Sequence, residues 1–341
     1  MNDGLISVII PVFNGAGTLG ETVESLQAQT DPHWEAIIVN DGSTDNTEGV
    51  AQDLARQDQR LRVISQENAG QAVARNHGLT VARGSLIAFL DADDWWTVDK
   101  LADQRQALKN NAPAGFAYSW TDYVDDRNQR LHTGFHLGPS GQIFLALLGN
   151  NFIENGSNPL VRRSALEAVG GFESDYIPAE DWDLWLKLAA KFEGVAVSKP
   201  QIRYRVSASS SSASLHRLEN ACVRVLERHI AIAPQECAAA AQHLKRPAKA
   251  RFYKGLACKA LTAGAPTRQR GLNSARLLTL AIANRPSLLS EAKFLIVMAV
   301  KIGLILVLSV EGMERSRQWF KKNSKVHDSP TKSRTESPID R

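Results

Sequence analysis

Short apolar runs alternate with amphipathic segments over the first 90 residues of the chain. The apolar runs lie at residues 6–11, 35–40, 61–64 and 86–90, and have the length and side-chain types of strands. The segments between them, residues 18–29, 47–56 and 71–81, carry apolar side chains at helical spacing. Strands that are apolar on both faces and separated by helices are typical of a parallel sheet covered on each side.

Three of these strands end in segments that contain polar residues, at the edge where open sheets of this kind bind ligands. They read PVFNG at 11–15, NDGSTD at 40–45 and DADD at 91–94. Asp91 and Asp93 are two residues apart, so an extended chain would place both carboxylates on one side. Carboxylates this close repel unless a cation lies between them, and Mg²⁺ or Mn²⁺ is the usual one. DADD thus predicts a metal and a phosphate-containing ligand, although alone it is equally typical of a polar turn.

Two common phosphate-binding loops are excluded. Neither GxGxxG nor GxxxxGK[ST] occurs at a strand end. A nucleotidyltransferase would need a basic, glycine-rich loop after the first strand, but residues 15–20, GAGTLG, contain no Lys or Arg.

Charge divides the chain into two unlike parts. Residues 1–200 carry 15 Lys+Arg against 27 Asp+Glu, a net charge of −12, whereas residues 201–341 carry 25 against 9, a net charge of +16. The basic part fits an anionic membrane surface or phosphates, with a solvated helical surface as the alternative. The three cysteines lack metal-ligand spacing and indicate a reducing compartment. With no secretory signal before the first strand, we expect a cytoplasmic location.

The C-terminal part has a helical pattern. Helices are expected at 215–232, 238–263 and 273–284, with Pro234, Pro247, Pro266 and Pro286 breaking them or lying near their ends. Residues 294–310 are 17 almost wholly apolar positions, but Lys301 would cost about 2.5–3.5 kcal/mol inside a bilayer. We therefore expect a helix that lies on the inner face of the plasma membrane, with a buried core helix as the alternative. Flanking basic and aromatic residues favour the membrane: Arg285, Lys293, Arg315, Arg317, Trp319, Phe320, Lys321 and Lys322.

Four motifs in order now resemble the family 2 glycosyltransferases. They are residues 7–14 (SVIIPVFN), 38–47 (IVNDGSTDNT), 68–76 (NAGQAVARN) and 89–94 (FLDADD), and the resemblance extends to about residue 205. It implies a GT-A fold, a Rossmann-like and mostly parallel sheet with helices on both faces. It also implies a nucleotide-diphosphate sugar as donor and inversion at the anomeric carbon. A departure follows Tyr204-Arg205, where Val206 and Ser207 stand in place of the His that many relatives have one residue after the Arg.

The resemblance also implies residue roles. Pro11, Val12, Phe13 and Asn14 would wall the base pocket, Asp41 would accept the base N3–H, and Asp91 would hold the ribose beside Ala92. Asp93 would bind the Mn²⁺ or Mg²⁺ that bridges the diphosphate, and Arg75 would help to neutralise that diphosphate. Arg75 has an alternative as a surface residue paired with an acidic neighbour.

A second acidic segment, AEDWDLWL at 179–186, matches the position of the family's base. Asp181 would take the proton from the acceptor hydroxyl, while Glu180 and Trp182 would shape the sugar and acceptor site. Acidic residues at a helix start are also favoured by the helix dipole alone. Asp183 is expected to be structural.

These observations predict three parts: a catalytic domain at 1–214, a helical, basic, membrane-associating region at 215–322 and a disordered tail at 323–341. Residues 207–214, with six serines among eight, would form a mobile loop or a linker. The predicted function is transfer of a sugar, with a UDP-sugar favoured, to a lipid-linked or polysaccharide acceptor in cell-surface glycan synthesis. The alternatives are a catalytically inactive scaffold that binds nucleotide or carbohydrate and, more remotely, a nucleotidyltransferase. No nucleic-acid partner is expected.

Overall fold

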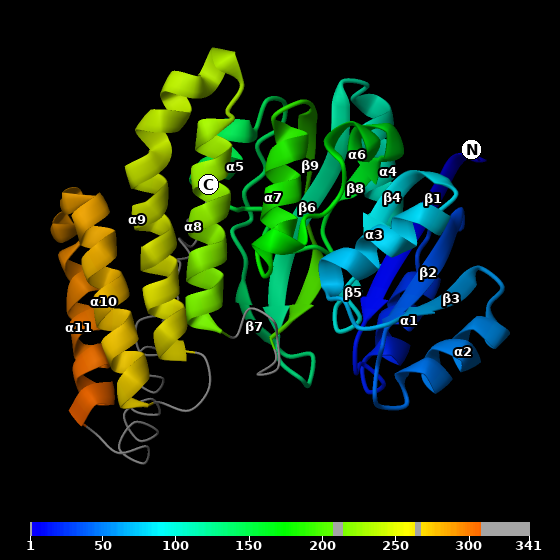
Figure 1. Cartoon of the computed structure of the whole chain (residues 1–341), viewed down its shortest axis with the longest axis horizontal. Coiled ribbons are helices and arrows are strands. Elements are labelled where there is room, and N and C mark those ends of the chain that lie inside the picture. The colour runs from blue at the N-terminus through cyan, green and yellow to red at the C-terminus, as the bar shows by residue number, and fades with distance from the viewer. Residues whose placement is uncertain (1, 207–213, 263–266, 308–341) are drawn as a thin grey trace, which may run out of the picture. The chain divides into compact units, whose positions relative to one another are not determined.

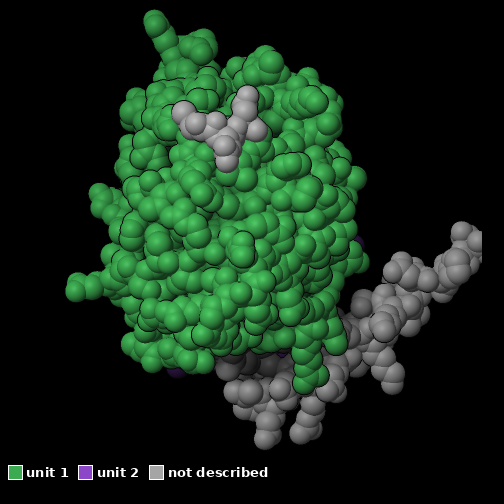
Figure 2. Space-filling view, turned by 90° about the vertical axis from the view of Figure 1, so that its right-hand side faces the viewer, with its two compact units in different colours: residues 1–252 green, residues 253–341 purple. Residues whose placement is uncertain are grey.

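The structure is a computed structural model of the 341-residue chain, and it describes residues 2–206, 214–262 and 267–307. The chain divides into two compact units, residues 1–252 and residues 253–341, which Figure 2 draws in different colours. The three-part division expected from the sequence stays a prediction. Helix α8 (Leu215–Ala231), which that division assigns to the second part, packs into the core of the first unit.

Nine strands in the described part of the chain form one sheet (Figure 1). Its order is β3-β2-β1-β4-β8-β6-β9-β5, with β7 beside β6. Strands β1 to β4 are parallel, as predicted, and so are β6 and β9, whereas β5, β7 and β8 run antiparallel to their neighbours. The strands are β1 (Asn2–Val12), β2 (Trp34–Asp41), β3 (Leu61–Gln66), β4 (Gly84–Phe89), β5 (Trp95–Trp96), β6 (Ala114–Val124), β7 (Arg130–Thr133), β8 (Leu160–Arg162) and β9 (Glu193–Arg205).

Helices cover both faces of this sheet, as the apolar strands require. In β1, Ile6, Val8 and Ile10 face one core while Ile9 faces the other, because strand side chains alternate. The first core includes α1 (Leu19–Gln27), α2 (Thr47–Gln57) and α4 (Lys100–Asn110). The second includes α3 (Gln71–Val81), α5 (Phe144–Gly149), α6 (Arg163–Val169), α7 (Glu180–Ala189) and α8, and two short 3₁₀ turns, η1 (Ser174–Tyr176) and η3 (Gln235–Cys237), lie in this part of the chain.

The strand order places the candidate site. From β1 the chain moves outward to β2 and β3, then returns to pair β4 with the other side of β1. A crevice forms at the carboxyl ends of strands where the order reverses in this way. Both β1 and β4 end there, and the acidic residues 91–94 follow β4 directly.

The second unit is helical in its described residues. Helix α9 (Ala238–Thr262) begins in the first unit, ends in the second and continues through Pro247, where the sequence had led us to expect a helix break or end. It is followed by α10 (Arg268–Asn284), the 3₁₀ turn η4 (Pro286–Ser290) and α11 (Ala292–Val307). Within this unit α10 lies against α11 at Gly271, where an added Cβ would come within 3.0 Å of the Ile305 side chain.

The apolar run expected at 294–310 forms most of α11. None of the helices in the described ranges combines the length and the apolar content that crossing a bilayer requires. Residues 207–213 and 308–341, with the basic and aromatic positions expected at 315–322 and the expected disordered tail, lie outside the described residues.

Candidate active site

The acidic segment after β4 is held by buried hydrogen bonds. Ser157 accepts the Asp91 N–H at 3.0 Å and donates its hydroxyl to Asp94 Oδ2 at 2.5 Å. The other oxygen of Asp94 accepts the Arg205 N–H at 3.1 Å. Burial, together with the charges of Asp93 and Asp91, raises the pKa of Asp94 well above its ordinary value. Asp94 therefore anchors the segment and does not face a ligand.

Asp93 has different surroundings. No side chain of the described residues donates a hydrogen bond to its carboxylate, which is only half buried. Burial, and then the charge of Asp91, raises its pKa to about 6. A divalent cation would relieve this repulsion, so the donor set fits a hard metal ion bound by Asp93 beside Asp91. No group of three or more His, Cys, Asp or Glu side chains in the described part of the chain could hold a metal by itself. Other ligands would have to come from substrate and water.

Arg75 joins the two acidic segments of the site. Its Nη2 lies 2.6 Å from Asp91 Oδ1, and its Nη1 lies 2.9 Å from Glu180 Oε1. The guanidinium is 2% exposed and packs over the Phe172 ring at 4.9 Å. An added Cβ on Gly156 would come within 2.6 Å of Nη2, so the chain passes closely over this group. The alternative expectation was that Arg75 is a surface residue paired with an acidic neighbour. Arg75 does pair with acidic neighbours, but it is buried and not on the surface.

Asp181 lies in the first turn of α7, beside Glu180. Burial, followed by the charge of Glu180, raises its pKa to about 7, while Arg75 acts in the opposite direction. The Trp182 N–H donates to Asp181 Oδ1 at 2.7 Å and orients the carboxylate. A carboxylate whose pKa lies near neutrality is well matched to accept a proton at physiological pH.

Trp182 itself lies in the core. It is 5% exposed and its indole N–H donates to the Leu147 carbonyl at 3.1 Å. The ring thus has a packing function that fixes the start of α7, and its expected contact with a sugar stays a prediction. Asp183 is fully buried, 2.8 Å from both His229 and Lys187, in agreement with a structural role.

The predicted base pocket lies at the ends of β1 and β2. Pro11 and Val12 are buried, whereas Phe13 is 51% exposed and free to contact a planar ligand. Asn14 has a left-handed φ of 51° and accepts the Thr44 N–H at 2.8 Å, which ties the two strand ends together. Ala92 packs against the core below Gly15.

Asp41 is buried, and both of its oxygens accept hydrogen bonds within the chain. Oδ1 accepts from the Gln66 side chain at 2.8 Å and the Ala69 N–H at 2.9 Å, and Oδ2 accepts the Gly70 N–H at 2.9 Å. Oδ2 retains a lone pair for a further donor. In this structure Asp41 holds the loop that leads into α3, and its bond to a base stays a prediction.

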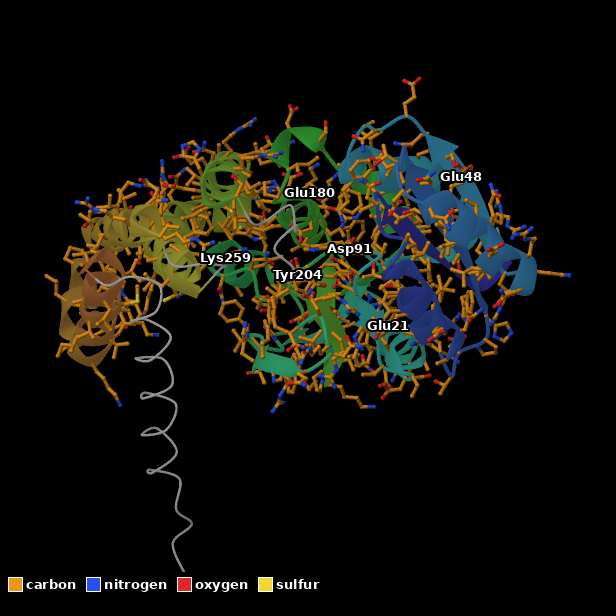
Figure 3. All side chains as sticks on the ribbon, turned by 90° about the horizontal axis from the view of Figure 1, so that it is seen from below. Glu21, Glu48, Asp91, Glu180, Tyr204 and Lys259 are labelled. Carbon is orange, nitrogen blue, oxygen red and sulfur yellow. The ribbon has the colours of Figure 1, made fainter. Side chains whose placement is uncertain are left out.

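Three residues of this site were missed by the motifs. Arg205 donates through Nε to the Asp93 carbonyl at 2.9 Å and through Nη2 to Glu21 at 2.6 Å. Gln71 donates to Asp91 at 2.8 Å, and Ser157 braces the acidic segment. The available signals were the Tyr204-Arg205 pair for Arg205 and the motif at 68–76 for Gln71, whereas Ser157 had none. Figure 3 shows Glu180, Asp91, Tyr204 and Glu21 in the same region of the first unit.

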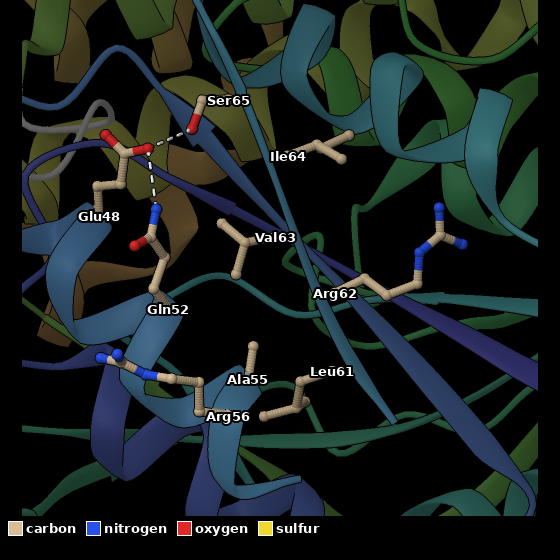
Figure 4. Close-up of a pocket in the computed structure, with 9 residues that line it drawn as sticks. All are labelled: Glu48, Gln52, Ala55, Arg56, Leu61, Arg62, Val63, Ile64 and Ser65. Atoms are coloured by element: carbon tan, nitrogen blue, oxygen red, sulfur yellow. Dashed lines mark hydrogen bonds between the residues drawn. The ribbon is translucent and has the colours of Figure 1, made fainter. Parts of the chain in front are cut away.

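A pocket elsewhere holds none of these residues. It lies between α2 and the edge strand β3, where Glu48 accepts hydrogen bonds from Ser65 and Gln52 (Figure 4). Its lining contains none of the clustered carboxylates that follow β4, so we place the candidate site at the ends of β1 and β4.

Comparisons with known proteins show which family the chain resembles. The sequence profile described as Glycosyl transferase family 2 matches residues 7–170. The chain is 32% identical over 218 residues to the Escherichia coli UDP-Glc:alpha-D-GlcNAc-diphosphoundecaprenol beta-1,3-glucosyltransferase WfgD, covering 63% of this chain and 82% of WfgD. With three other curated relatives, the match spans only 34% to 46% of the relative's length.

Two solved structures share the fold. S. aureus TarS 1-349 superposes with a TM-score of 0.60 at 19% identity, covering 92% of both chains. The mannosyltransferase PcManGT from Pyrobaculum calidifontis, solved with GDP-Man and Mn²⁺, gives a TM-score of 0.54 at 20% identity, covering 89% of this chain and 86% of PcManGT. TarS has also been solved with UDP and with UDP-GlcNAc. The GT-A fold expected from the sequence is confirmed.

Proposed function

Because the chain belongs to the family 2 glycosyltransferases, we propose that it moves a sugar from a nucleotide-diphosphate sugar to a lipid-linked or polysaccharide acceptor in cell-surface glycan synthesis. The observation that carries the proposal is the buried Arg75, which joins Asp91 to Glu180. Arg75 holds Asp91, which would contact the donor, close to Glu180, the neighbour of the candidate base Asp181. A displacement reaction requires the donor and the base to be held at one place in this way.

The donor would lie across the ends of β1, β2 and β4. Pro11, Val12, Phe13 and Asn14 would contact the base, Asp41 would accept its N–H, and Asp91 would bind the ribose. A uridine nucleotide is favoured, since the name of WfgD specifies UDP-Glc and TarS has been solved with UDP.

Asp93, with Asp91 beside it, would hold a Mn²⁺ or Mg²⁺ ion, which when bound neutralises charge on the leaving diphosphate. Arg75 holds Asp91 in place for this, and Arg205 fixes the backbone at Asp93. Asp181 would accept the proton of the acceptor hydroxyl while that oxygen attacks the anomeric carbon opposite the leaving group. The product then has inverted configuration.

The acceptor would be presented at a membrane. Ile296, Val297 and Val300 on α11 are 64%, 44% and 44% exposed, and Lys293 and Lys301 are exposed on the same helix. The described residues of α11 include no acidic side chain. Such a face fits the interface of an anionic bilayer, so the protein would lie on the inner face of the plasma membrane. Ile296→Glu should move the protein from the membrane pellet to the supernatant at low salt, and an unchanged distribution would contradict this assignment.

The first test is calorimetric titration of the purified protein with UDP, dTDP and GDP, each with and without Mn²⁺. We expect one nucleotide to bind in a metal-dependent way, and Asp93→Ala to abolish that dependence. Asp53→Ala, on the exposed surface of α2, is the matched control. If the wild-type protein binds none of the three nucleotides, the inactive scaffold becomes the better hypothesis.

A further inference from the structure

Glu154 has an unusual backbone conformation close to the site. In the described residues four non-glycine positions have positive φ, and three of them are Asn or His, which adopt this conformation most readily. Glu154, at φ 77°, is the fourth. A conformation of this kind is unfavourable by itself and is retained when the surroundings fix it, commonly at a ligand clamp.

The surroundings that fix it belong to the active site. Two residues further along, Gly156 lies against the Arg75 guanidinium, and Ser157 then bonds to Asp91 and Asp94. Asn155 donates to the Thr121 hydroxyl at 2.9 Å. Glu154 thus lies two and three residues before the positions that contact Arg75 and the acidic segment.

The Glu154 carboxylate is only partly satisfied. Oε1 accepts the Tyr123 hydroxyl at 3.1 Å, and Oε2 accepts the Phe135 N–H at 3.2 Å. Among the described residues no Lys, Arg or His forms an ion pair with it, and burial raises its pKa to about 7. Each oxygen can accept a second hydrogen bond. The half-buried group can therefore accept a donor from a ligand.

Aromatic side chains connect Glu154 to the acidic segment. Tyr123 in β6 pairs in register with Tyr204 in β9, and their rings lie 5.3 Å apart. His132 stacks on Tyr123 at 4.4 Å. The residue after Tyr204 is Arg205, which binds the backbone at Asp93. Tyr204 and Asp91 are labelled in the same region of Figure 3.

We propose that Glu154, Tyr123 and Tyr204 form a subsite for a pyranose ring, with a sugar hydroxyl donating to the Glu154 carboxylate. A hydrogen bond to an ionised carboxylate is stronger than one between neutral groups, and an aromatic ring suits the apolar face of a sugar. The inference rests on the proposed glycosyltransferase function. The donor sugar and the acceptor sugar share this chemistry, so the experiment separates them.

The experiment compares the wild-type protein with Glu154→Gln, Tyr123→Phe and Glu48→Gln. Glu48 is the matched control, because its carboxylate also accepts a side-chain hydroxyl, from Ser65 at 3.2 Å, but lies in α2. Calorimetry measures affinity for UDP and for UDP-glucose with Mn²⁺. Steady-state transfer to a synthetic N-acetylglucosaminyl diphospholipid gives KM for each substrate. Thermal unfolding confirms that each variant is folded.

A donor subsite predicts that Glu154→Gln weakens UDP-glucose binding by about tenfold or more and leaves UDP affinity within twofold. An acceptor subsite predicts unchanged binding of both nucleotides and a tenfold higher acceptor KM. Tyr123→Phe should give a smaller change of the same kind, and it carries the test alone if Glu154→Gln does not fold.

Folded variants whose affinities and KM values all stay within twofold of wild type would overturn the subsite. If the wild-type protein binds dTDP or GDP in place of UDP, the same comparison is made with that nucleotide and its diphosphate-linked glucose. If it binds none of the three nucleotides, the proposed function fails, and the subsite fails with it.

Discussion

Two acidic segments meet at Arg75, and they differ in what surrounds each carboxylate. In the segment after β4, Asp94 is buried and bonded to Ser157 and Arg205, whereas Asp93 lacks a side-chain donor in the described residues. In the first turn of α7, Glu180 takes the ion pair with Arg75, and Asp181 forms no ion pair with described residues. In each segment, therefore, some carboxylates are bonded within the chain and one, Asp93 or Asp181, is left for chemistry.

The difference between the two remaining carboxylates indicates a division of labour. Asp93 lies beside Asp91 and has a pKa of about 6, an arrangement that a cation stabilises. Asp181 is more strongly affected by burial, has a pKa of about 7 and lies at a helix start, an arrangement that favours proton transfer. The same side-chain type thus obtains two functions from two environments.

The largest effect is expected from removing the base. Asp181→Asn keeps the shape and the Trp182 contact but cannot take a proton, so kcat should fall by about 10²–10⁴-fold. UDP affinity should stay within twofold of wild type by calorimetry. Near-normal turnover in the Asn variant would show that Asp181 is not the base. The proposed difference in function between Asp93 and Asp181 would then be wrong.

Removing the shared cation should damage both segments at once. Arg75→Met leaves Asp91 and Glu180 without their buried partner, and we expect a loss of about 3–5 kcal/mol in the free energy of unfolding, measured with urea. Arg56→Met, which breaks an exposed pair with Asp53, should change it by less than about 1 kcal/mol. If the two substitutions lowered the free energy of unfolding equally, the ion pairs of Arg75 would not be what holds the two acidic segments together.

Neighbouring carboxylates of one segment should respond differently. Asp94→Asn disturbs the bonds to Ser157 and Arg205 and should lower the midpoint of thermal unfolding by several degrees. Asp93→Asn removes a charge that Asp91 repels, so at pH 7 without metal it should not lower that midpoint, whereas it should lower the Mn²⁺-dependent UDP affinity about tenfold. If the two variants behave alike in both measurements, the assignment of structural and ligand-binding carboxylates is wrong.

The smallest effect concerns pH. The ordinary pKa of an aspartate is 3.8, and in the folded protein those of Asp93 and Asp181 are raised to about 6 and about 7. From about pH 5 to 7 these two groups hold protons in the folded state that the unfolded state has released, so stability should decrease as pH rises through this window. Below it, carboxylates with lowered pKa values, such as Asp58 and Asp99 at about 2, act in the opposite direction. Asp181→Asn should flatten the decrease between pH 6 and 7 in particular. A stability curve that rises over this range would contradict the raised pKa values.

Much of the first unit could be predicted from its sequence. The period of apolar residues located β1 to β4 and α1 to α3 within a few residues, and helix α3 was placed at both of its observed ends, residues 71 and 81. In the second half of the sheet, β5 and β8 could not be predicted, because they have only two and three residues, and strands so short carry no period. The long strand β6 was missed as well, since it is buried along almost its whole length and shows no alternation.

The candidate site could likewise be predicted only in part. The strand ends and the acidic residues at 91–94 and 180–181 were visible as local motifs. The inward orientation of Asp94, the burial of Arg75 and the packing of Trp182 were not visible, because each depends on partners more than 30 residues away.

The sequence by itself determined which segments form strands and helices and which strand ends are acidic, because both properties depend on residues close together along the chain. The tertiary structure alone decided that α3, β4, α7 and residues 154–157 meet around one buried guanidinium. The pKa of a carboxylate depends on burial and on charges from distant segments, so the division between structural and reactive carboxylates arises only once the chain has folded.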